Sequence, residues 1–410
     1  MSSDPWFQHL FADRIGGAQY GKSNEIYKFE KIKRAKRAAL AAHPDRKLLD
    51  FGIGENDEMA DVGVREQLKV EVDELDNRGY ADNGIGEFKE AAASFMESTF
   101  GVKLDPTTEI NHAIGSKPAL AMLPAAFINP GEVTLMTVPG YPVAGTHTKY
   151  YGGEVHRLPL LEENGFYPDL DSISEDVRKR AKLLVINYPN SPTGAIATEA
   201  FYRKVIDFAR ANDVIVIQDA AHALLSYEGE PTSFLQIDGA KDVGVEVHSL
   251  SKGFNMIGWR IGFVAGHAKL VQAFSDVKDN CDSGQFIAIQ KAASKALSTS
   301  EIWKQTRQKY RRRLQILVDA LNQVGFEAKM PSGTYFLYVK SPKGCEGQTF
   351  ANAEEAAQFL ITEQSVCTVP WDDAGSYLRF SVTYQANGEA EENALMEETR
   401  DRLAKLKLQF

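Results

Sequence analysis

The sequence predicts an α/β protein whose central sheet is mostly parallel and whose functional site lies at the carboxyl ends of the strands. Short apolar runs, such as residues 183–187 and 214–218, alternate with segments of helical periodicity through the middle of the chain. Several runs are followed directly by polar or glycine-rich residues, and the carboxyl ends of parallel strands meet at one edge of a sheet. At 410 residues the chain is too long for one small core, so we expect two domains.

Composition and charge narrow the class of protein. The chain is 43% hydrophobic and 25% charged, as is usual for a soluble globular protein, and its formal charge of −10 argues against a nucleic-acid partner. Cys281, Cys345 and Cys367 are too widely spaced for a disulfide framework or a metal site, which favours a reducing compartment. The first residues show no basic region followed by an apolar run, and no apolar run approaches membrane length. We therefore expect a cytoplasmic protein with no metal ion and no membrane partner.

The N-terminal part contains a misleading motif. Residues 1–24 are polar and indicate an arm, and residues 25–43 have the apolar spacing of a helix. Within the arm, residues 16–23 satisfy the G-x-x-x-x-G-K-[ST] pattern of a nucleotide-binding P-loop. A P-loop follows a buried strand, and residues 11–15 are too polar and too few to form one. The pattern therefore does not predict a nucleotide site.

Beyond the arm, strands and helices alternate. We expect strands at residues 48–51, 133–138, 183–187, 214–218, 243–247, 335–339, 366–370 and 377–383, with a further strand ending after residue 110. We expect helices from residue 87, after residue 117, and at residues 268–278, 287–297, 301–324, 351–365 and 389–406. Gly325 ends the long helix at 301–324, which we expect to join the large domain to the small one.

One window, residues 249–263, carries the strongest chemical signal. It holds Ser249, Ser251, Lys252 and Arg260 in the pattern S-x-S-K-x(7)-R-x-G, just after an apolar strand. A partly desolvated lysine can form a Schiff base with an aldehyde, and hydroxyls with a guanidinium bind phosphate. Pyridoxal 5'-phosphate (PLP) carries both groups. The alternative is a surface loop with a solvated lysine and arginine.

Asp219 supports the PLP interpretation. It ends the apolar run 214–218 and precedes Lys252 by 33 residues. A carboxylate at that place can keep the pyridine nitrogen of PLP protonated, so that the ring accepts electrons. The alternative is an aspartate that caps a loop.

The window at 249–263, together with Asp219, resembles the Schiff-base segment of class I/II aminotransferases, which are fold-type-I PLP enzymes. The resemblance extends from about Tyr27 to Arg379. It implies an α/β fold with a large PLP-binding domain at 51–297 and a smaller α/β domain at 298–410. Residues 1–50 would form the arm and part of the small domain. It also implies a homodimer.

Further cofactor-binding residues follow from this resemblance. Ser116 and Lys117 precede an apolar helix, whose first backbone N–H groups attract phosphate. Tyr141, after the strand at 133–138, matches the residue that stacks on the cofactor ring. Tyr80 matches a tyrosine that reaches the partner subunit's phosphate. Each also has an ordinary explanation, as a helix cap or a loop aromatic.

Two positions depart from the family pattern. An asparagine usually stands directly before Pro-Thr-Gly and donates to the ring oxygen, but here Ser191 holds that place and Asn190 precedes it. The shorter hydroxyl would reach the oxygen only through water. His222 stands where a tyrosine is usual; it could donate to the same oxygen, and we expect its charge to titrate near neutrality.

Three residues match substrate-binding positions of the family. Arg379 matches the arginine that binds the substrate α-carboxylate through a bidentate pair, and Gly54 matches a backbone position near that carboxylate. Tyr27 matches a tyrosine of the N-terminal arm. Taken alone, Arg379 would be better explained by a surface ion pair. A turn explains Gly54 equally well, and packing on Phe29 explains Tyr27 equally well.

The resemblance implies amino transfer between an amino acid and a 2-oxo acid with ping-pong kinetics, Lys252 moving the proton. It favours LL-2,6-diaminopimelate, or its cyclic form tetrahydrodipicolinate, with glutamate and 2-oxoglutarate, in lysine biosynthesis. The nearest alternative is an aminotransferase for aspartate or aromatic amino acids. Others are a PLP-dependent C–S lyase of the same fold and a non-catalytic PLP-binding module.

Overall fold

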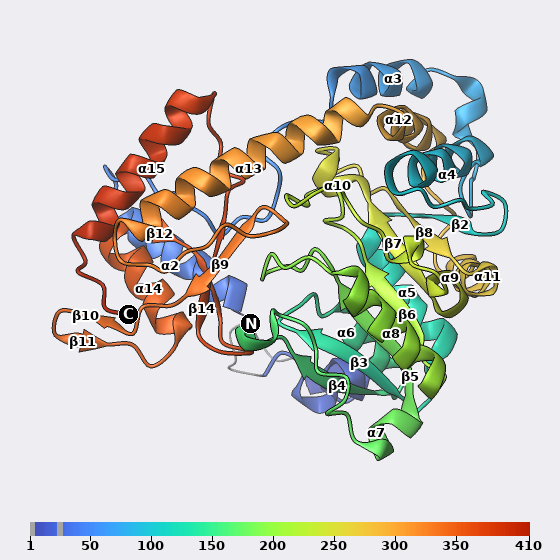
Figure 1. Cartoon of the computed structure of the whole chain (residues 1–410), viewed down its shortest axis with the longest axis horizontal. Coiled ribbons are helices and arrows are strands. Elements are labelled where there is room, and N and C mark those ends of the chain that lie inside the picture. The colour runs from blue at the N-terminus through green and yellow to red at the C-terminus, as the bar shows by residue number, and fades with distance from the viewer. Residues whose placement is uncertain (1–4, 23–27) are drawn as a thin grey trace.

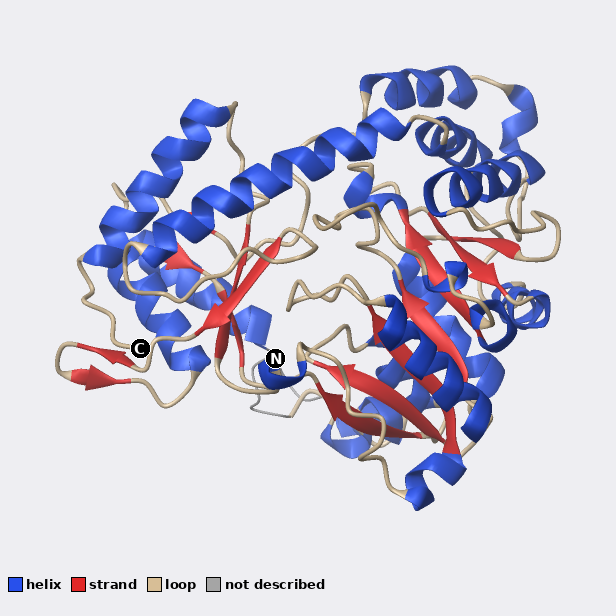
Figure 2. Ribbon diagram, viewed as in Figure 1, coloured by secondary structure: helices blue, strands red, loops and turns tan. Residues whose placement is uncertain are grey.

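The computed structural model describes residues 5–22 and 28–410 and divides them into two lobes (Figure 1). One lobe contains a seven-stranded sheet and the other a three-stranded sheet, as the separate groups of strands in Figure 2 show. Helix α13 (Ser300–Asn322) begins beside α12 (Ile287–Leu297) of the first lobe and runs along the second. None of the helices in these described residues is long and apolar enough to cross a membrane.

The large sheet has the predicted α/β character, because all its strand pairs are parallel except those made by β8. In spatial order the strands are β2 (Ile110–Ala113), β8 (Gly262–Gly266), β7 (Gly244–Ser249), β6 (Ile215–Asp219), β5 (Ala181–Asn187), β3 (Val133–Val138) and β4 (Glu154–Pro159). The carboxyl ends of β5, β6 and β7 therefore lie side by side.

Both faces of this sheet are covered by helices. Along β5, Leu184 and Ile186 pack into one apolar core while Leu183 and Val185 pack into another, because successive strand residues point to opposite faces. The first core is covered by α4 (Gly86–Phe100), α8 (Glu199–Asn212) and α12. The second is covered by α5 (Ser116–Phe127), α6 (Val143–Tyr150) and α11 (Ala268–Lys278).

The second lobe combines the C-terminal part of the chain with a segment from near the N-terminus. Its antiparallel sheet has the order β13 (Val369–Trp371), β14 (Tyr377–Ser381), β9 (Phe336–Lys340). Helix α2 (Lys28–Ala42) packs on α14 (Ala353–Gln364), α15 (Glu389–Ala404) packs on α13, and β1 (Leu49–Asp50) pairs in parallel with β12 (Val366–Cys367). Leu49 and Phe51 lie in the core of this lobe. The domain boundaries at 50 and 297 stay a prediction.

The expected single strand at 366–370 is wrong. Val366 and Cys367 pair with β1, whereas Val369 pairs with Arg379 of β14, so the chain changes sheet at Thr368. The pattern at 16–23 follows a 3₁₀ turn (Asp13–Ile15) rather than a strand, which agrees with the rejection of a P-loop.

The remaining elements are short or lie at the edges. They are α1 (Pro5–Gln8), α3 (Val62–Val72), α7 (Glu175–Arg180), α9 (Ala240–Val243), α10 (Leu250–Gly253), β10 (Gly344–Cys345) and β11 (Gln348–Thr349). Further 3₁₀ turns occur at Gly17–Gln19, Leu75–Arg78, Glu162–Asn164 and Phe234–Gln236.

Candidate active site

Two neighbouring strands place the predicted acid and the predicted lysine at one edge of the large sheet. Asp219 is the last residue of β6 and pairs with Val247 of β7. After β7 the chain turns directly into α10, which carries Lys252. The side chain of Ser249 caps this helix by accepting a hydrogen bond from the Ser251 N–H at 3.1 Å.

Asp219 is buried and has no ion-pair partner among residues 5–22 and 28–410. Its carboxylate accepts one backbone hydrogen bond, from Ala221 at 3.1 Å, and its carbonyl accepts one from Asn187 at 2.8 Å. Burial raises the pKa of Asp219 to about 6, although the Ala221 N–H and the charges of His248 and Lys252 act in the opposite direction. This carboxylate could therefore gain a cationic partner such as a protonated pyridine ring.

Lys252 contacts the chain segment that leads from β1 into the large lobe. Its Nζ donates to the carbonyl of Gly54 at 3.0 Å and lies 5.5 Å from the centre of the Tyr335 ring. The hydroxyl of Tyr335 donates to the same Gly54 oxygen at 2.7 Å. Asn56 donates to the backbone carbonyl of Lys252 at 2.7 Å. The amine is thus held between the two lobes by a backbone carbonyl, and it forms no ion pair within the described residues.

The ends of three strands bring the phosphate candidates together. Gly262 of β8 pairs with Ala113 of β2 on one side and with Ser249 of β7 on the other. Gly115 follows β2 with φ +80°, and a Cβ at this position would lie 2.3 Å from Nη2 of Arg260. A side chain at 115 would therefore displace the guanidinium.

Arg260 completes a cationic cradle at this corner. Its Nη1 donates to the hydroxyl of Ser251 at 3.3 Å and to the carbonyl of Ile257 at 2.7 Å. Ser116 and Lys117 form the first turn of α5, directly after the glycine that contacts the guanidinium. Hydroxyls, a guanidinium and the start of a twelve-residue helix are groups that bind phosphate.

Tyr141 and Tyr80 differ in their relation to this site. Tyr141 lines a small cavity together with Asn187 and Asp219, so the structure brings the predicted stacking residue to the predicted acid. Tyr80 lies between the 3₁₀ turn at Leu75–Arg78 and α4, and 87% of it is exposed. The role of Tyr80 at the phosphate site stays a prediction.

Asn190 and Ser191, the two candidates before Pro-Thr-Gly, have different hydrogen-bond partners. Asn190 is buried, and its Oδ1 accepts hydrogen bonds from the N–H and the hydroxyl of Thr193 at 3.2 and 2.8 Å. Its Nδ2 has no hydrogen-bond partner among the described residues. The N–H of Ser191 donates to Asn187 at 2.9 Å, which holds the serine beside the end of β5.

The expectation that His222 titrates near neutrality is wrong. The ring is buried, packs edge-on against Tyr335 with centroids 5.3 Å apart, and has no described partner at Nδ1. Burial, reinforced by the charges of Lys252 and Arg379, lowers the pKa of His222 to about 3. The imidazole is therefore neutral at physiological pH.

Arg379 is a buried cation rather than a surface one. It is 7% exposed, its guanidinium lies 4.1 Å from the centre of the Phe336 ring, and its Nη2 donates to the Gly52 carbonyl at 3.3 Å. Burial lowers the pKa of Arg379 to about 10, which leaves it charged. Within the described residues it forms no ion pair, and its Nε has no hydrogen-bond partner. A carboxylate ligand would satisfy both deficits.

The backbone beside Arg379 is tightly packed. A Cβ on Gly54 would lie 3.2 Å from Cζ of Phe336, so a side chain here would require the Phe336 ring to shift by a few tenths of an ångström. Tyr27 lies outside the described residues.

Tyr335, Asn56 and Asn187 belong to the site and were not singled out from the sequence. Tyr335 follows Gly333-Thr334 at the start of a strand, and an aromatic pair after such a turn is a usable signal. Asn187 ends an apolar strand, as Asp219 does. Asn56 has no comparable pattern around it.

These groups match the parts of one cofactor. PLP has an aldehyde, a pyridine nitrogen and a phosphate, and the chain offers a lysine, a buried acid and a cationic cradle at one sheet edge. The fold and the site thus define a fold-type-I PLP-dependent enzyme. The model of the family described as aminotransferase class I and II matches residues 46–396, and the chain belongs to that family.

Curated relatives and solved structures agree with this assignment. LL-diaminopimelate aminotransferase of Methanocaldococcus jannaschii is 56% identical, covering 99% of this chain and 100% of the relative. The enzyme of the same name from Methanococcus maripaludis is 55% identical, with the same coverage. A substrate-bound structure of BacF from Bacillus subtilis is 30% identical, has a TM-score of 0.85, and covers 95% of this chain and 97% of its own. The protein is therefore an aminotransferase that uses PLP.

Proposed function

We propose that this aminotransferase exchanges an amino group between LL-2,6-diaminopimelate, or its cyclic form tetrahydrodipicolinate, and the glutamate/2-oxoglutarate pair. Lysine biosynthesis would be the pathway. The observation that carries this proposal is the 56% identity to an LL-diaminopimelate aminotransferase over essentially the whole of both chains. Fold alone would not distinguish this substrate from aspartate or an aromatic amino acid.

The proposed mechanism assigns binding and proton transfer to this chain's residues. When bound, PLP would supply a protonated pyridine ring that can accept the electron pair left at the substrate Cα. Arg379 binds the substrate α-carboxylate through two hydrogen bonds and releases the Gly52 carbonyl. Lys252 Nζ would release the Gly54 carbonyl, take the proton from the substrate Cα and deliver it to C4' of the cofactor. Asp219 would hold the proton on the pyridine nitrogen throughout.

The cradle would hold the cofactor without taking part in proton transfer. The phosphate is assigned to Ser116, Lys117, Ser249, Ser251 and Arg260, and the ring face to Tyr141. The polar groups nearest the ring oxygen are assigned to Asn190, Ser191 and His222. The neutral imidazole can donate a hydrogen bond to that oxygen without adding a charge.

Assembly as a homodimer follows from the same proposal. Tyr80 is exposed in one chain and would contact the phosphate of the partner subunit, so each site would be complete only in the dimer. The exposed aromatic ring is consistent with a contact surface. We propose the cytoplasm as the location, which suits a biosynthetic enzyme of small metabolites.

A substrate panel tests this function. The purified protein with PLP should transfer the amino group from LL-diaminopimelate to 2-oxoglutarate with kcat/KM at least about a hundredfold above aspartate and phenylalanine. Higher activity with either of those two would replace the proposed substrate. Release of pyruvate and ammonia from a β-substituted amino acid would indicate a C–S lyase instead.

A further inference from the structure

The segment at residues 52–57 connects the two ends of the proposed substrate site. Three successive carbonyl oxygens of this segment accept hydrogen bonds from side chains: Gly52 from Arg379 at 3.3 Å, Ile53 from Thr383 at 2.8 Å, and Gly54 from Lys252 at 3.0 Å. The backbone of the 52–57 segment therefore spans the distance between the arginine and the lysine, and its position sets where a carboxylate and an amine can dock together.

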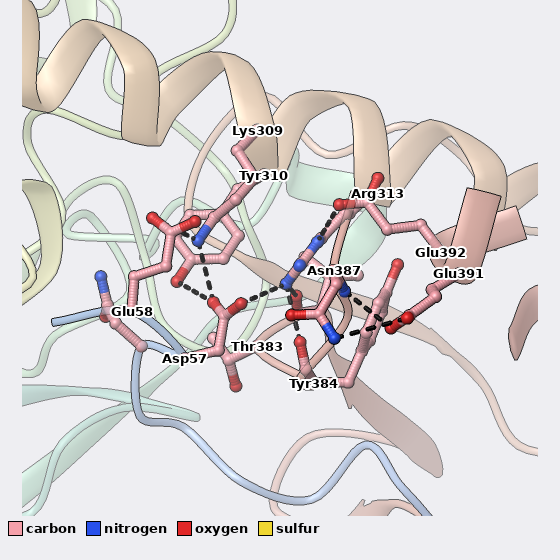
Figure 3. Close-up of polar contacts among 12 residues, drawn as sticks. Asp57, Glu58, Lys309, Tyr310, Arg313, Thr383, Tyr384, Asn387, Glu391 and Glu392 are labelled. Atoms are coloured by element: carbon pink, nitrogen blue, oxygen red, sulfur yellow. Dashed lines mark hydrogen bonds and ion pairs between the residues drawn. The ribbon is translucent and has the colours of Figure 1, made fainter. Parts of the chain in front are cut away.

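Asp57 holds the far end of this segment. Its side chain is 4% exposed; Oδ1 accepts hydrogen bonds from Lys309 at 2.9 Å and Tyr310 at 3.1 Å, and Oδ2 accepts one from Arg313 at 3.0 Å (Figure 3). Burial would raise the pKa of Asp57, but the charges of Lys309 and Arg313 outweigh it and the net shift is downward. All three donors lie on α13, so a charged carboxylate fixes the segment to the long helix.

Arg313 links this carboxylate to the strand that carries Arg379. The side chain of Arg313 is 1% exposed, and its Nη1 also donates to the carbonyls of Val382 at 3.1 Å and Tyr384 at 2.8 Å. These residues continue the chain directly beyond β14. Its Nε donates to Glu392 of α15 at 2.7 Å, and Figure 3 shows the guanidinium between the two acids. One guanidinium thereby fixes the 52–57 segment relative to the end of β14.

A second connection reaches the lysine. The ring of Tyr310 lies 5.2 Å from the ring of Tyr335, and the Tyr335 hydroxyl shares the Gly54 oxygen with Lys252. Asp57 is therefore linked through Arg313 to the chain that follows β14, and through Tyr310 to the ring of Tyr335. Apolar residues of the same volume often stabilise a protein as well as a buried ion pair does. Stability alone therefore does not explain why Asp57 and Arg313 are paired here.

We propose that Asp57 and Arg313 form a positioning pair, which holds the 52–57 backbone so that Arg379 and Lys252 can engage one substrate molecule at the same time. Neither residue would touch the substrate or the cofactor. This role rests on the proposed functions of Arg379 and Lys252, but it does not depend on which amino acid is the substrate.

Asp57→Asn tests the pair with little change in side-chain volume. It leaves the buried Arg313 with Glu392 as its remaining carboxylate partner. It also turns an amide N–H₂, or a weaker acceptor, toward the three donors that face Asp57. Displacement of a binding group by about 1 Å can cost up to a hundredfold, so we expect KM for both the amino donor and the 2-oxo acid to rise at least about tenfold. The kcat at saturation and the bound PLP should change by less than about threefold, and amide hydrogen exchange at residues 51–58 should become faster.

Arg312→Gln is the matched control. Arg312 neighbours Arg313 on α13 and donates twice to Glu392, at 2.9 Å each, but does not contact the 52–57 segment. The Arg312→Gln substitution removes charged hydrogen bonds from the same network. The free energy of unfolding should therefore fall, while KM and the amide hydrogen exchange at residues 51–58 stay at wild-type values. Wild-type KM in folded Asp57→Asn, or an equal rise in Arg312→Gln, would overturn the proposal.

A double-mutant cycle separates positioning from general weakening. In an Arg379→Lys background, Asp57→Asn should raise KM much less than it does in the wild type, because both changes act on the same carboxylate contact. Full multiplication of the two effects would contradict the proposal. If Asp57→Asn does not fold, Arg313→Lys keeps a cation beside Asp57 but cannot also hold the carbonyls of Val382 and Tyr384. KM in this variant should rise at least about two- to threefold, and an unchanged KM would reject the pair.

These measurements use whichever amino donor the wild type turns over. Failure with LL-diaminopimelate would therefore reject the substrate assignment alone. Equal KM values in Asp57→Asn and the wild type would reject the positioning pair alone.

Discussion

Lys252 and Tyr335 donate to the same oxygen, the carbonyl of Gly54, from the two lobes of the molecule. The lysine comes from the turn after β7 and the tyrosine precedes β9. Their common acceptor is a backbone group, which cannot move independently of the 52–57 segment. The contact therefore joins the lysine that would move the proton to the lobe that carries Arg379.

Tyr335→Phe tests this shared contact. The change keeps the ring against Lys252, His222 and Tyr310 but removes one of two donors to Gly54. We expect a loss of about 1 kcal/mol in the free energy of unfolding and a fall in kcat/KM of about tenfold, with unchanged PLP content. Denaturant unfolding and steady-state kinetics measure the two effects, and wild-type kcat/KM would exclude a role for the hydroxyl.

Arg379→Ala should raise KM for amino donor and 2-oxo acid alike, by about a hundredfold, since a buried charge pair with the carboxylate is lost in both half-reactions. Arg379→Lys keeps the charge but cannot make the bidentate pair, so its KM should lie between those of the wild type and Arg379→Ala. Steady-state kinetics with each substrate varied gives both values. An unchanged KM for both substrates would remove Arg379 from the site.

Asp219→Asn should lower kcat by roughly a hundred- to a thousandfold, because an amide does not hold the proton on the pyridine nitrogen as a carboxylate does. Asp219→Glu retains the charge and should recover part of the rate. Single-turnover kinetics, normalised to bound PLP, separates slow chemistry from poor cofactor retention. A wild-type rate in the fully loaded asparagine variant would contradict the assignment.

The cofactor-free protein should show a pH dependence of stability that belongs to His222. Its pKa is lowered from 6.5 to about 3 in the folded state, chiefly by burial, so between these values the unfolded chain holds a proton that the folded chain lacks. The contribution is complete above pH 6.5 and is lost as the pH falls toward 3. Denaturant unfolding of the wild type and of His222→Gln should therefore diverge in this window by about a few kcal/mol, the wild type losing more.

Asp219 changes stability in the opposite sense, because its raised pKa makes the folded state bind the proton more tightly between pH 3.8 and about 6. This contribution is present in both proteins and cancels in the comparison. Parallel curves for the wild type and His222→Gln would show that the imidazole is not buried as described.

The sequence predicted those features that depend on residues near one another in the chain, namely the bounds of several elements and the residues at the ends of strands. The apolar run of β3 and the helical spacing of α11 and α12 gave the observed bounds. Asp219 ends an apolar strand, and Lys252 lies on the short helix that follows another. Periodicity and strand-end chemistry are local properties, so one sequence carries them.

Contacts between distant residues could not be predicted in this way. Asp57 and Arg313 are 256 residues apart, and nothing near either residue indicates the other. The burial of Arg379 depends on Phe336 from another strand, and the low pKa of His222 depends on its enclosure. The strand at 366–370 divides because its two halves pair with different partners, β1 and β14.

The most direct measurement concerns the bond between Lys252 and the cofactor. The protein loaded with PLP is treated with borohydride, digested, and its peptides are mapped by mass spectrometry, with Lys252→Ala as the control. The account predicts one pyridoxyl group, attached to Nζ of Lys252, and none in the variant, which should also lose the visible absorbance of bound PLP and its turnover. A label on another lysine, or a fully active Lys252→Ala, would contradict it.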